Sequence, residues 1–299
     1  MGYHSFARAY NPECTSLTPA EHAAIPTPMA DRYVAAAVQM SSGADRAANL
    51  ARAADLVREA AARGARLVVL PEVFAWRGPR ADEPSIAEPI PGPTTEMLAA
   101  LARSLAIHLC AGSLLERAGD ETRAYNTSCL FDPRGTLVAR YRKVHLFDVE
   151  IPGRVSVRES ATRAPGGDVV AVPTELGTLG LSVCYDLRFP ELYRRLVRAG
   201  AEVLLVPSAF TFPTGAAHWE VLCRARAIEN QCWLVAADQT GTSPHGFPDW
   251  GDSLIVDPWG RVVARAGDGE AVITAEIDRD YLARVRRELP CLTHARLAV

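Results

Sequence analysis

Two segments of this chain occur twice, in the same order, and this repetition constrains the fold more than any other feature of the sequence. RGARLVVLPEVF at 63–74 resembles AGAEVLLVPSAF at 199–210, and FDPRGTLVAR at 131–140 resembles VDPWGRVVAR at 256–265. The first pair indicates a helix end, a glycine and a buried strand, and the second pair indicates a hairpin with an Asp-Pro-x-Gly turn. We therefore expect two pseudo-equivalent halves whose sheets pack on one another, with helices outside. A chance repeat of common turn residues is the alternative.

Apolar strand-like runs alternate with helix-like runs along the chain. YVAAAVQM at 33–40 is followed by an alanine-rich helical segment at 45–63 and then by the apolar run ARLVVLP. This alternation is typical of an α/β protein. We expect residues 32–299 to form one domain. Residues 1–31 lack periodicity, and we expect them to form a disordered extension.

The composition excludes several classes of function. The 299 residues are 48% apolar and 22% charged, with a net charge of -3 and with the basic residues spread along the chain. We therefore expect a globular protein that binds neither nucleic acid nor an anionic membrane. The sequence has no apolar run of about 18 residues and no secretory h-region near its start, which favours a cytoplasmic location.

The cysteines are odd in number and form no short C-x-x-C pair. We therefore predict free thiols rather than a disulfide framework or a structural zinc site, and we expect no metal. The seven cysteines are Cys14, Cys110, Cys129, Cys184, Cys223, Cys232 and Cys291.

Cys184 ends the apolar run TLGLSVC and is followed by Asp-Leu-Arg and a helix-like segment at 190–199. Most free cysteines of this kind are small buried hydrophobic residues. The alternative is a nucleophile at a strand-to-helix turn. A thiol with an ordinary pKa of about 8.5 would then need a base or a cation close by.

Glu72 and Lys143 could supply that help. Each follows an apolar run, as Cys184 does, and we expect the three runs to be neighbours in one sheet. Glu72 could take the thiol proton, while Lys143 and a backbone N–H after Cys184 could stabilise an oxyanion. A nearby Lys143 would also hold Glu72 ionised. Taken singly, a charged residue at a strand end is more often solvated, so the hypothesis depends on the combination.

Six motifs, in this order, resemble those of the nitrilase, or carbon-nitrogen hydrolase, superfamily. Within it the chain resembles the Nit branch of amidases, which includes omega-amidases and deaminated glutathione amidase. The resemblance extends from Tyr33 to the C-terminus. The motifs are LPE at 70–72, YRKVHLFD at 141–148, CYDLRFPEL at 184–192, PSAF at 207–210, HWEVLCRARAIENQC at 218–232 and GDSLIVDPWG at 251–260.

The resemblance implies a Glu-Lys-Cys triad, which falls on Glu72, Lys143 and Cys184, and a second glutamate, which falls on Glu159. Without it, Glu159 in EIPGRVSVRES is an ordinary loop carboxylate. The resemblance also implies a four-layer α-β-β-α sandwich of the nitrilase type, which assembles into a homodimer or a larger homo-oligomer. The internal repeat agrees with that sandwich independently.

The implied function is hydrolysis of a small linear ω-amide of a carboxylic or α-keto acid, of the deaminated glutathione or α-ketoglutaramate type. Cys184 would form a thioester and ammonia would leave, with no cofactor. Alternatives within the family are an N-carbamoyl amine hydrolase, an aliphatic amidase and a nitrilase. A non-catalytic dimeric scaffold is the alternative outside enzymes, and the complete triad argues against it.

Several polar residues are candidates for substrate contacts. Tyr185, through its backbone N–H, Thr211 and Tyr125 are predicted to border the pocket. Arg188 could bind a substrate carboxylate through two parallel hydrogen bonds, or could pair instead with Glu191 or a second subunit. Asp252 stands where Nit relatives often have His, so the fine specificity of those relatives does not transfer.

Three histidines raise the alternative of a papain-like Cys-His pair. His145 lies two residues after Lys143, and His218 opens the helix-like run HWEVLCRARAIEN. The third is His245. We expect structural contacts rather than catalysis for His145 and His218.

Overall fold

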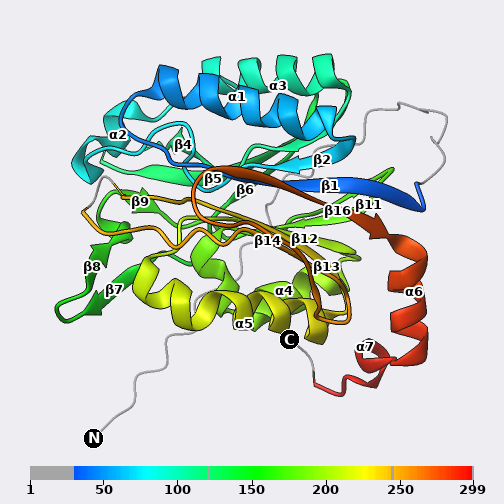
Figure 1. Cartoon of the computed structure of the whole chain (residues 1–299). Helices are drawn as coiled ribbons and strands as arrows, with labels where there is room; N and C mark the ends of the chain where they lie inside the picture. Colours follow the sequence, from blue (N-terminus) through cyan, green and yellow to red (C-terminus); the bar gives the residue numbers. More distant parts are fainter. Residues whose placement is uncertain (1–29, 120–121, 244–245, 298–299) are drawn as a thin grey trace, which may run out of the picture.

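The computed structural model describes residues 30–119, 122–243 and 246–297. They form four layers, with two β-sheets face to face and helices on both outer sides (Figure 1). This is the α-β-β-α sandwich expected from the sequence. The predicted extension lies outside the described residues apart from Ala30 and Asp31, whose backbones hydrogen-bond to those of Glu175 and Arg279.

The first sheet has three parallel strands at its centre and antiparallel strands on both sides. Its central strands are almost wholly buried, as parallel strands covered on both faces must be. In spatial order the sheet comprises β16 (Ala271–Asp278), β1 (Arg32–Gln39), β2 (Ala65–Val69), β3 (His108–Cys110), β5 (Ala124–Phe131) and β4 (Leu114–Arg117), with β6 (Leu137–Arg142) and β9 (Arg163–Ala164) also paired to β5.

The second sheet repeats this plan, with three parallel strands between antiparallel neighbours. A separate two-stranded hairpin forms a third, small sheet. In spatial order the second sheet comprises β10 (Ala171–Thr174), β11 (Gly177–Leu181), β12 (Val203–Ser208), β13 (Trp233–Asp238), β14 (Leu254–Val256) and β15 (Val262–Arg265), and the hairpin comprises β7 (Asp148–Ile151) and β8 (Val155–Arg158).

The repeat in the sequence is therefore a repeat in the structure. The first repeated segment forms β2 and β12, the middle parallel strands of the two sheets. The second forms the hairpins β5–β6 and β14–β15, which adjoin equivalent sheet positions. In each hairpin an aspartate, Asp132 or Asp257, accepts hydrogen bonds from backbone N–H groups two and four residues later. The prediction of two pseudo-equivalent halves is confirmed.

Alternating side chains of each strand explain how the layers pack. In β1, Ala35 and Ala37 belong to the core between the two sheets, whereas Ala36 and Val38 belong to the core under the outer helices. This division follows from the two-residue period of a strand. Because both faces are buried, the residues of β1 from Val34 to Val38 are all apolar.

Helices α1 and α3 cover the first sheet, and α4 and α5 cover the second (Figure 1). The helix predicted at 45–63 is α1, and the Asp45 side chain caps it by accepting a hydrogen bond from the Ala48 N–H. The helix predicted from His218 begins earlier, because Pro213 is compatible with a first turn. The helices are α1 (Arg46–Ala62), α2 (Glu83–Ile86), α3 (Pro93–Leu105), α4 (Pro190–Arg198), α5 (Phe212–Asn230), α6 (Arg279–Glu288) and α7 (Cys291–His294).

Two further expectations concern membranes and thiols. Within the described ranges, no helix is both long and apolar enough to cross a bilayer. The six cysteines that the structure describes carry free thiols, as predicted, and Cys14 lies outside these residues.

Candidate active site

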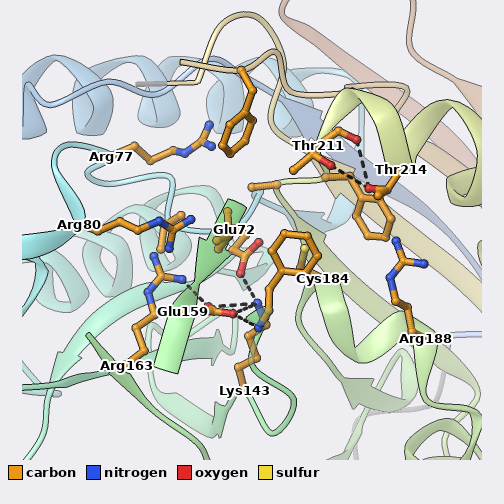
Figure 2. Close-up of a pocket in the computed structure, with 16 residues that line it drawn as sticks. Glu72, Arg77, Arg80, Lys143, Glu159, Arg163, Cys184, Arg188, Thr211 and Thr214 are labelled. Carbon is orange, nitrogen blue, oxygen red and sulfur yellow. Dashed lines mark hydrogen bonds and ion pairs between the residues drawn. The ribbon is translucent and has the colours of Figure 1, made fainter. Parts of the chain in front are cut away.

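The three residues of the predicted triad come from both sheets. Glu72 follows β2 and Lys143 follows β6 in the first sheet, whereas Cys184 follows β11 in the second. The expectation that the three runs are neighbours in one sheet is therefore wrong. Because the sheets pack face to face, strand ends from both open on one cavity, which all three side chains line (Figure 2).

Cys184 lies in a sharp turn between a strand and a helix. Its φ of 50° is in the left-handed region, which costs a non-glycine residue about 1–3 kcal/mol and is typical of functional sites. The residue opens a 3₁₀ turn, η3 (Cys184–Arg188), that leads into α4. Such turns present a nucleophile at the end of a sheet. The side chain accordingly lines the cavity, although the residue is only 7% exposed.

Lys143 lies between two buried carboxylates. Its Nζ is 2.9 Å from Oε1 of Glu72, and 3.0 and 3.2 Å from the two oxygens of Glu159. Asn126 donates a second hydrogen bond to Oε1 of Glu72, at 2.7 Å. All four residues are at most 3% exposed. The side chains are therefore held in one arrangement by contacts within the protein.

These contacts fix the charges of Lys143 and Glu159. Burial alone would lower the pKa of Lys143, but the carboxylates of Glu159 and Glu72 raise it well above its usual value. Burial alone would raise the pKa of Glu159, but Lys143 and Arg163 hold it well below the usual value. Lys143 is therefore a permanent ammonium and Glu159 a permanent carboxylate at neutral pH.

Cys184, unlike Lys143 and Glu159, is held in its neutral form. Burial raises the pKa of its thiol well above the ordinary value, the Glu72 carboxylate raises it further, and Lys143 partly opposes both effects. The resting residue is therefore a neutral thiol. It can act as a nucleophile only by passing its proton to a base, and Glu72 is a carboxylate of the same cavity that is electrostatically coupled to it.

Arg163 and Glu83 complete the charged network, and the sequence identifies neither. Arg163 donates one hydrogen bond to Glu159, at 2.6 Å, and two to Glu83, at 2.7 and 2.9 Å. The one feature of the sequence that could have identified Arg163 is its position four residues after Glu159, a spacing that suits an ion pair. Glu83 gives no signal, because 80 residues separate it from its partner.

The cavity is narrow, with a volume of ≈ 50 Å³. Charged residues line one part of it, and aromatic rings and threonines line another. No group of three or more His, Cys, Asp or Glu side chains is arranged to hold a metal within the described part of the chain. The lining residues are Glu72, Val73, Arg77, Arg80, Lys143, Phe147, Val157, Glu159, Arg163, Cys184, Arg188, Ala209, Phe210, Thr211, Thr214 and Phe247.

Of the predicted substrate contacts, Arg188 and Thr211 line this cavity. Thr211 is buried, and its hydroxyl lies 2.9 Å from that of Thr214. The side chain of Tyr185 packs edge-on against two phenylalanine rings, which leaves only its backbone for the predicted role. Tyr125 does not line the cavity, because its ring lies under the Arg142 guanidinium.

The histidines and Asp252 have other partners. Nδ1 of His145 lies 2.7 Å from Asp186, and Nδ1 of His218 lies 3.1 Å from Arg188. Neither histidine lines the cavity. His245 lies outside the described residues. Asp252 pairs with Arg265 at 2.8 Å, also away from the cavity.

Similar proteins share this chain's sequence over most of its length. The chain is 46% identical over 267 residues to the human deaminated glutathione amidase, which covers 87% of this chain and 81% of that protein. It is 43% identical over 242 residues to the omega-amidase NIT2 of Xenopus tropicalis, which covers 81% of this chain and 87% of that protein.

A solved structure and a family model agree with these relatives. The NitFhit protein of C. elegans superposes with a TM-score of 0.83 at 40% identity, over 89% of this chain and 65% of NitFhit. The chain thus spans less than two thirds of NitFhit. The family model described as carbon-nitrogen hydrolase matches residues 34–287, which include every residue of the charged network. This chain therefore belongs to the carbon-nitrogen hydrolase family.

Proposed function

We propose that this chain is an amidase that uses Cys184 to hydrolyse a small linear ω-amide of a carboxylic or α-keto acid. The observation that carries this proposal is the meeting of Glu72, Lys143 and Cys184 in one cavity between two sheets. The names of the relatives, omega-amidase and deaminated glutathione amidase, support the substrate class.

The first chemical step couples proton transfer to attack. Glu72 takes the thiol proton as Sγ of Cys184 bonds to the amide carbon. The two events occur together because the raised pKa of Cys184 keeps the thiol protonated before the reaction. Negative charge moves to the carbonyl oxygen. Nζ of Lys143 and the backbone N–H of Tyr185 stabilise that charge.

The next steps release both products. Glu72 returns the proton to the amide nitrogen as the C–N bond breaks, so that ammonia or an amine leaves and the acyl group stays on Cys184 as a thioester. A water molecule then gives a proton to Glu72 and attacks the thioester carbon. The C–S bond breaks, the carboxylic acid leaves and Sγ takes the proton back. Glu159 orients Lys143 throughout.

Arg188 supports a substrate with a carboxylate at its far end. It lines the cavity, and its guanidinium lies 5.7 and 5.4 Å from the ring centres of Tyr185 and Phe210. An arginine fork in such a position can hold a carboxylate through two hydrogen bonds. Thr211 lies in the same part of the cavity (Figure 2).

Product formation from a panel of amides tests the proposal. The panel contains α-ketoglutaramate, succinamate, deaminated glutathione, an N-carbamoyl amine, a simple aliphatic amide and a nitrile, and the released acid and ammonia or amine are measured. We expect turnover of the carboxylate-bearing ω-amides that Cys184→Ala abolishes. The matched variant Cys291→Ala removes an exposed thiol outside the cavity and should keep full activity.

The other outcomes favour the alternatives. A preference for the carbamoyl compound, the aliphatic amide or the nitrile would replace the proposed substrate with that one. Turnover by Cys184→Ala would refute the mechanism. A folded protein that is silent on the whole panel, and whose Cys184 resists alkylation, would favour the non-catalytic scaffold.

The proposal includes a cytoplasmic location, which cell fractionation would test.

The proposal also includes assembly into a homo-oligomer. Helix α5 carries three exposed large apolar side chains, Phe212 at 49%, Val221 at 67% and Ile228 at 47%, and the last two lie two turns apart on one face. Trp259, in the turn of the β14–β15 hairpin, is 55% exposed. The hairpin packs on the helix here, since a Cβ on Gly260 would lie 2.3 Å from Ile228. This apolar face of α5 and the hairpin supports association with a second copy.

A further inference from the structure

Five cationic side chains line the cavity among the described residues, and three of them are paired with carboxylates. Lys143 pairs with Glu72 and Glu159, and Arg163 pairs with Glu83 and Glu159. Arg77 forms a two-pronged pair with Asp249. The two remaining cations are Arg80 and Arg188.

Among the described residues, Arg80 has no carboxylate partner. Its guanidinium makes no hydrogen bond or ion pair with any residue that the structure describes, although the side chain is half-buried and lines the cavity. Burial and the neighbouring Arg163 lower the pKa of Arg80 by more than the carboxylates of Glu83, Glu159 and Glu72 raise it, so the protein disfavours this charge as it stands. A half-buried cation without a carboxylate partner costs free energy, part of which an anionic ligand would recover.

Arg188 also forms no ion pair with a carboxylate in the described part of the chain. Its hydrogen-bonding partner in the described residues is the ring of His218, and it lies beside the aromatic rings of Tyr185 and Phe210. Figure 2 shows Arg80 and Arg188 on opposite sides of Cys184. A single carboxylate therefore cannot satisfy both arginines while an amide carbon lies at the cysteine.

The position of each arginine relative to Glu72 indicates which part of the substrate it would contact. The charges that act on Arg80 include Glu72, Glu83 and Glu159, so Arg80 lies on the side of the general base. Glu72 must protonate the leaving nitrogen, and the amine part of the substrate therefore extends toward Arg80. The acyl part extends toward Arg188.

We propose that Arg80 binds a carboxylate on the amine part of the substrate, while Arg188 binds the carboxylate of the acyl part. This inference rests on the proposed function and narrows it. Within the proposed substrates, the assignment favours the deaminated glutathione type, a dicarboxylic acid joined through an amide to a short peptide, over primary amides such as α-ketoglutaramate. Arg80 is then a specificity-determining residue.

Two amides that differ only in the second carboxylate test this assignment. Succinyl-glycine carries it, and succinyl-glycinamide replaces it with a neutral amide. We expect kcat/KM of the wild-type protein for succinyl-glycine to exceed that for succinyl-glycinamide about tenfold or more, as for a hydrogen bond between charged groups. Arg80→Gln should bring this ratio close to one, and Arg80→Lys should restore part of it.

Two other arginines provide matched controls. Arg188→Gln should lower kcat/KM for both amides by a similar factor, because both keep the acyl carboxylate, and should leave their ratio unchanged. Arg154→Gln removes an exposed arginine of the β7–β8 hairpin, outside the cavity, and should change neither value. A wild-type ratio near one, or an unchanged ratio in Arg80→Gln, would overturn the role of Arg80.

Binding separates failure of this inference from failure of the proposed function. Calorimetry on the Cys184→Ala protein measures affinity for the same two compounds without turnover. A preference for succinyl-glycine that Arg80→Gln removes would support the assignment even if the wild-type protein cleaves neither compound. No preference there would overturn it, whereas cleavage by Cys184→Ala would overturn the mechanism instead.

Discussion

Glu159 balances the charges of two buried cations. One of its oxygens accepts hydrogen bonds from Lys143 and Arg163, and the other accepts from Lys143 and the backbone N–H of Phe147. Phe147 and Lys143 belong to the segment that follows β6. Glu159 therefore fixes the position of the proposed oxyanion donor as well as its charge.

Glu159→Gln keeps the shape of the side chain and removes its charge. We expect the free energy of unfolding to fall by about 3 kcal/mol, because breaking a buried ion pair leaves charges uncompensated. We also expect kcat/KM to fall about 100-fold or more, the effect of losing an oxyanion donor. Urea unfolding and product assays measure the two effects.

The exposed Glu150 of β7 offers the control for this prediction. Glu150→Gln should change the free energy of unfolding by less than about 0.5 kcal/mol and leave kcat/KM unaltered. Wild-type values for both quantities in Glu159→Gln would contradict the role given to this carboxylate.

The sequence predicts the residues of this site unevenly. Glu72, Lys143 and Cys184 stand out because each closes an apolar run, and a resemblance in motif adds Glu159. Asn126 contacts Glu72 across 54 residues and Glu83 contacts Arg163 across 80, so no local pattern predicts these two pairs, whereas Arg163 lies only four residues after Glu159. Tyr125 illustrates the converse, since its neighbour Asn126 faces the network while its own ring packs under Arg142.

At the scale of elements, Asp186 joins the turn of Cys184 to the segment of Lys143. Its Oδ2 accepts hydrogen bonds from the Val183 N–H and from the Tyr141 hydroxyl, at 2.9 and 2.7 Å. Its Oδ1 accepts from the backbone N–H of His145, at 3.0 Å. One buried carboxylate thus sets how a turn of the second sheet meets a strand end of the first.

Tyr141→Phe removes one of these links without leaving a large cavity. Because the hydroxyl donates to a buried carboxylate, we expect the free energy of unfolding to fall by about 1.5–3 kcal/mol. We also expect a lower kcat, since the turn that carries Cys184 loses a constraint. Chemical denaturation and kinetics check both. Tyr281→Phe, at a partly exposed position on α6, should match the wild-type protein, and equal losses in the two variants would contradict this account.

Elements with strong local signals were predictable, and those that depend on partners were not. The helix at 45–63 has an N-cap aspartate and a long run of good helix formers. The start of α5 is hidden by Pro213 and Gly215, which disfavour a helix by propensity. Gly215 is needed there, because a Cβ would lie 2.2 Å from Trp250. That the site combines residues from two different sheets could not be inferred from the positions of the strand ends alone.

At the scale of the whole molecule, the buried carboxylates make stability depend on pH. Arg163 holds the pKa of Glu83 below its usual 4.5 against the effect of burial, and the pKa of Glu159 is also lowered. Below about pH 4.5 the unfolded chain binds protons that the folded protein does not, so stability is lost as the pH falls, by about 1.4 kcal/mol per pH unit for each group.

We therefore expect the free energy of unfolding to fall more steeply between about pH 5 and pH 3 in the wild-type protein than in Glu159→Gln. Burial raises the pKa values of Asp238 and Asp249, which act in the opposite direction but are common to both proteins. Urea titrations at a series of pH values measure the two slopes. Parallel slopes would show that Glu159 titrates as it does in the unfolded chain.

Assembly is the last property at this scale. A charge at Val221, the most exposed apolar residue of the α5 face, would be buried without a partner if two copies meet there. We expect the wild-type protein to elute as a dimer or larger and Val221→Glu to elute at the 32.3 kDa of one chain in light-scattering chromatography. Val138→Glu, at a 38% exposed position on β6, should keep the wild-type mass. A wild-type protein of 32.3 kDa would remove the oligomer from the proposal, and an unchanged mass in Val221→Glu would move the contact to another surface.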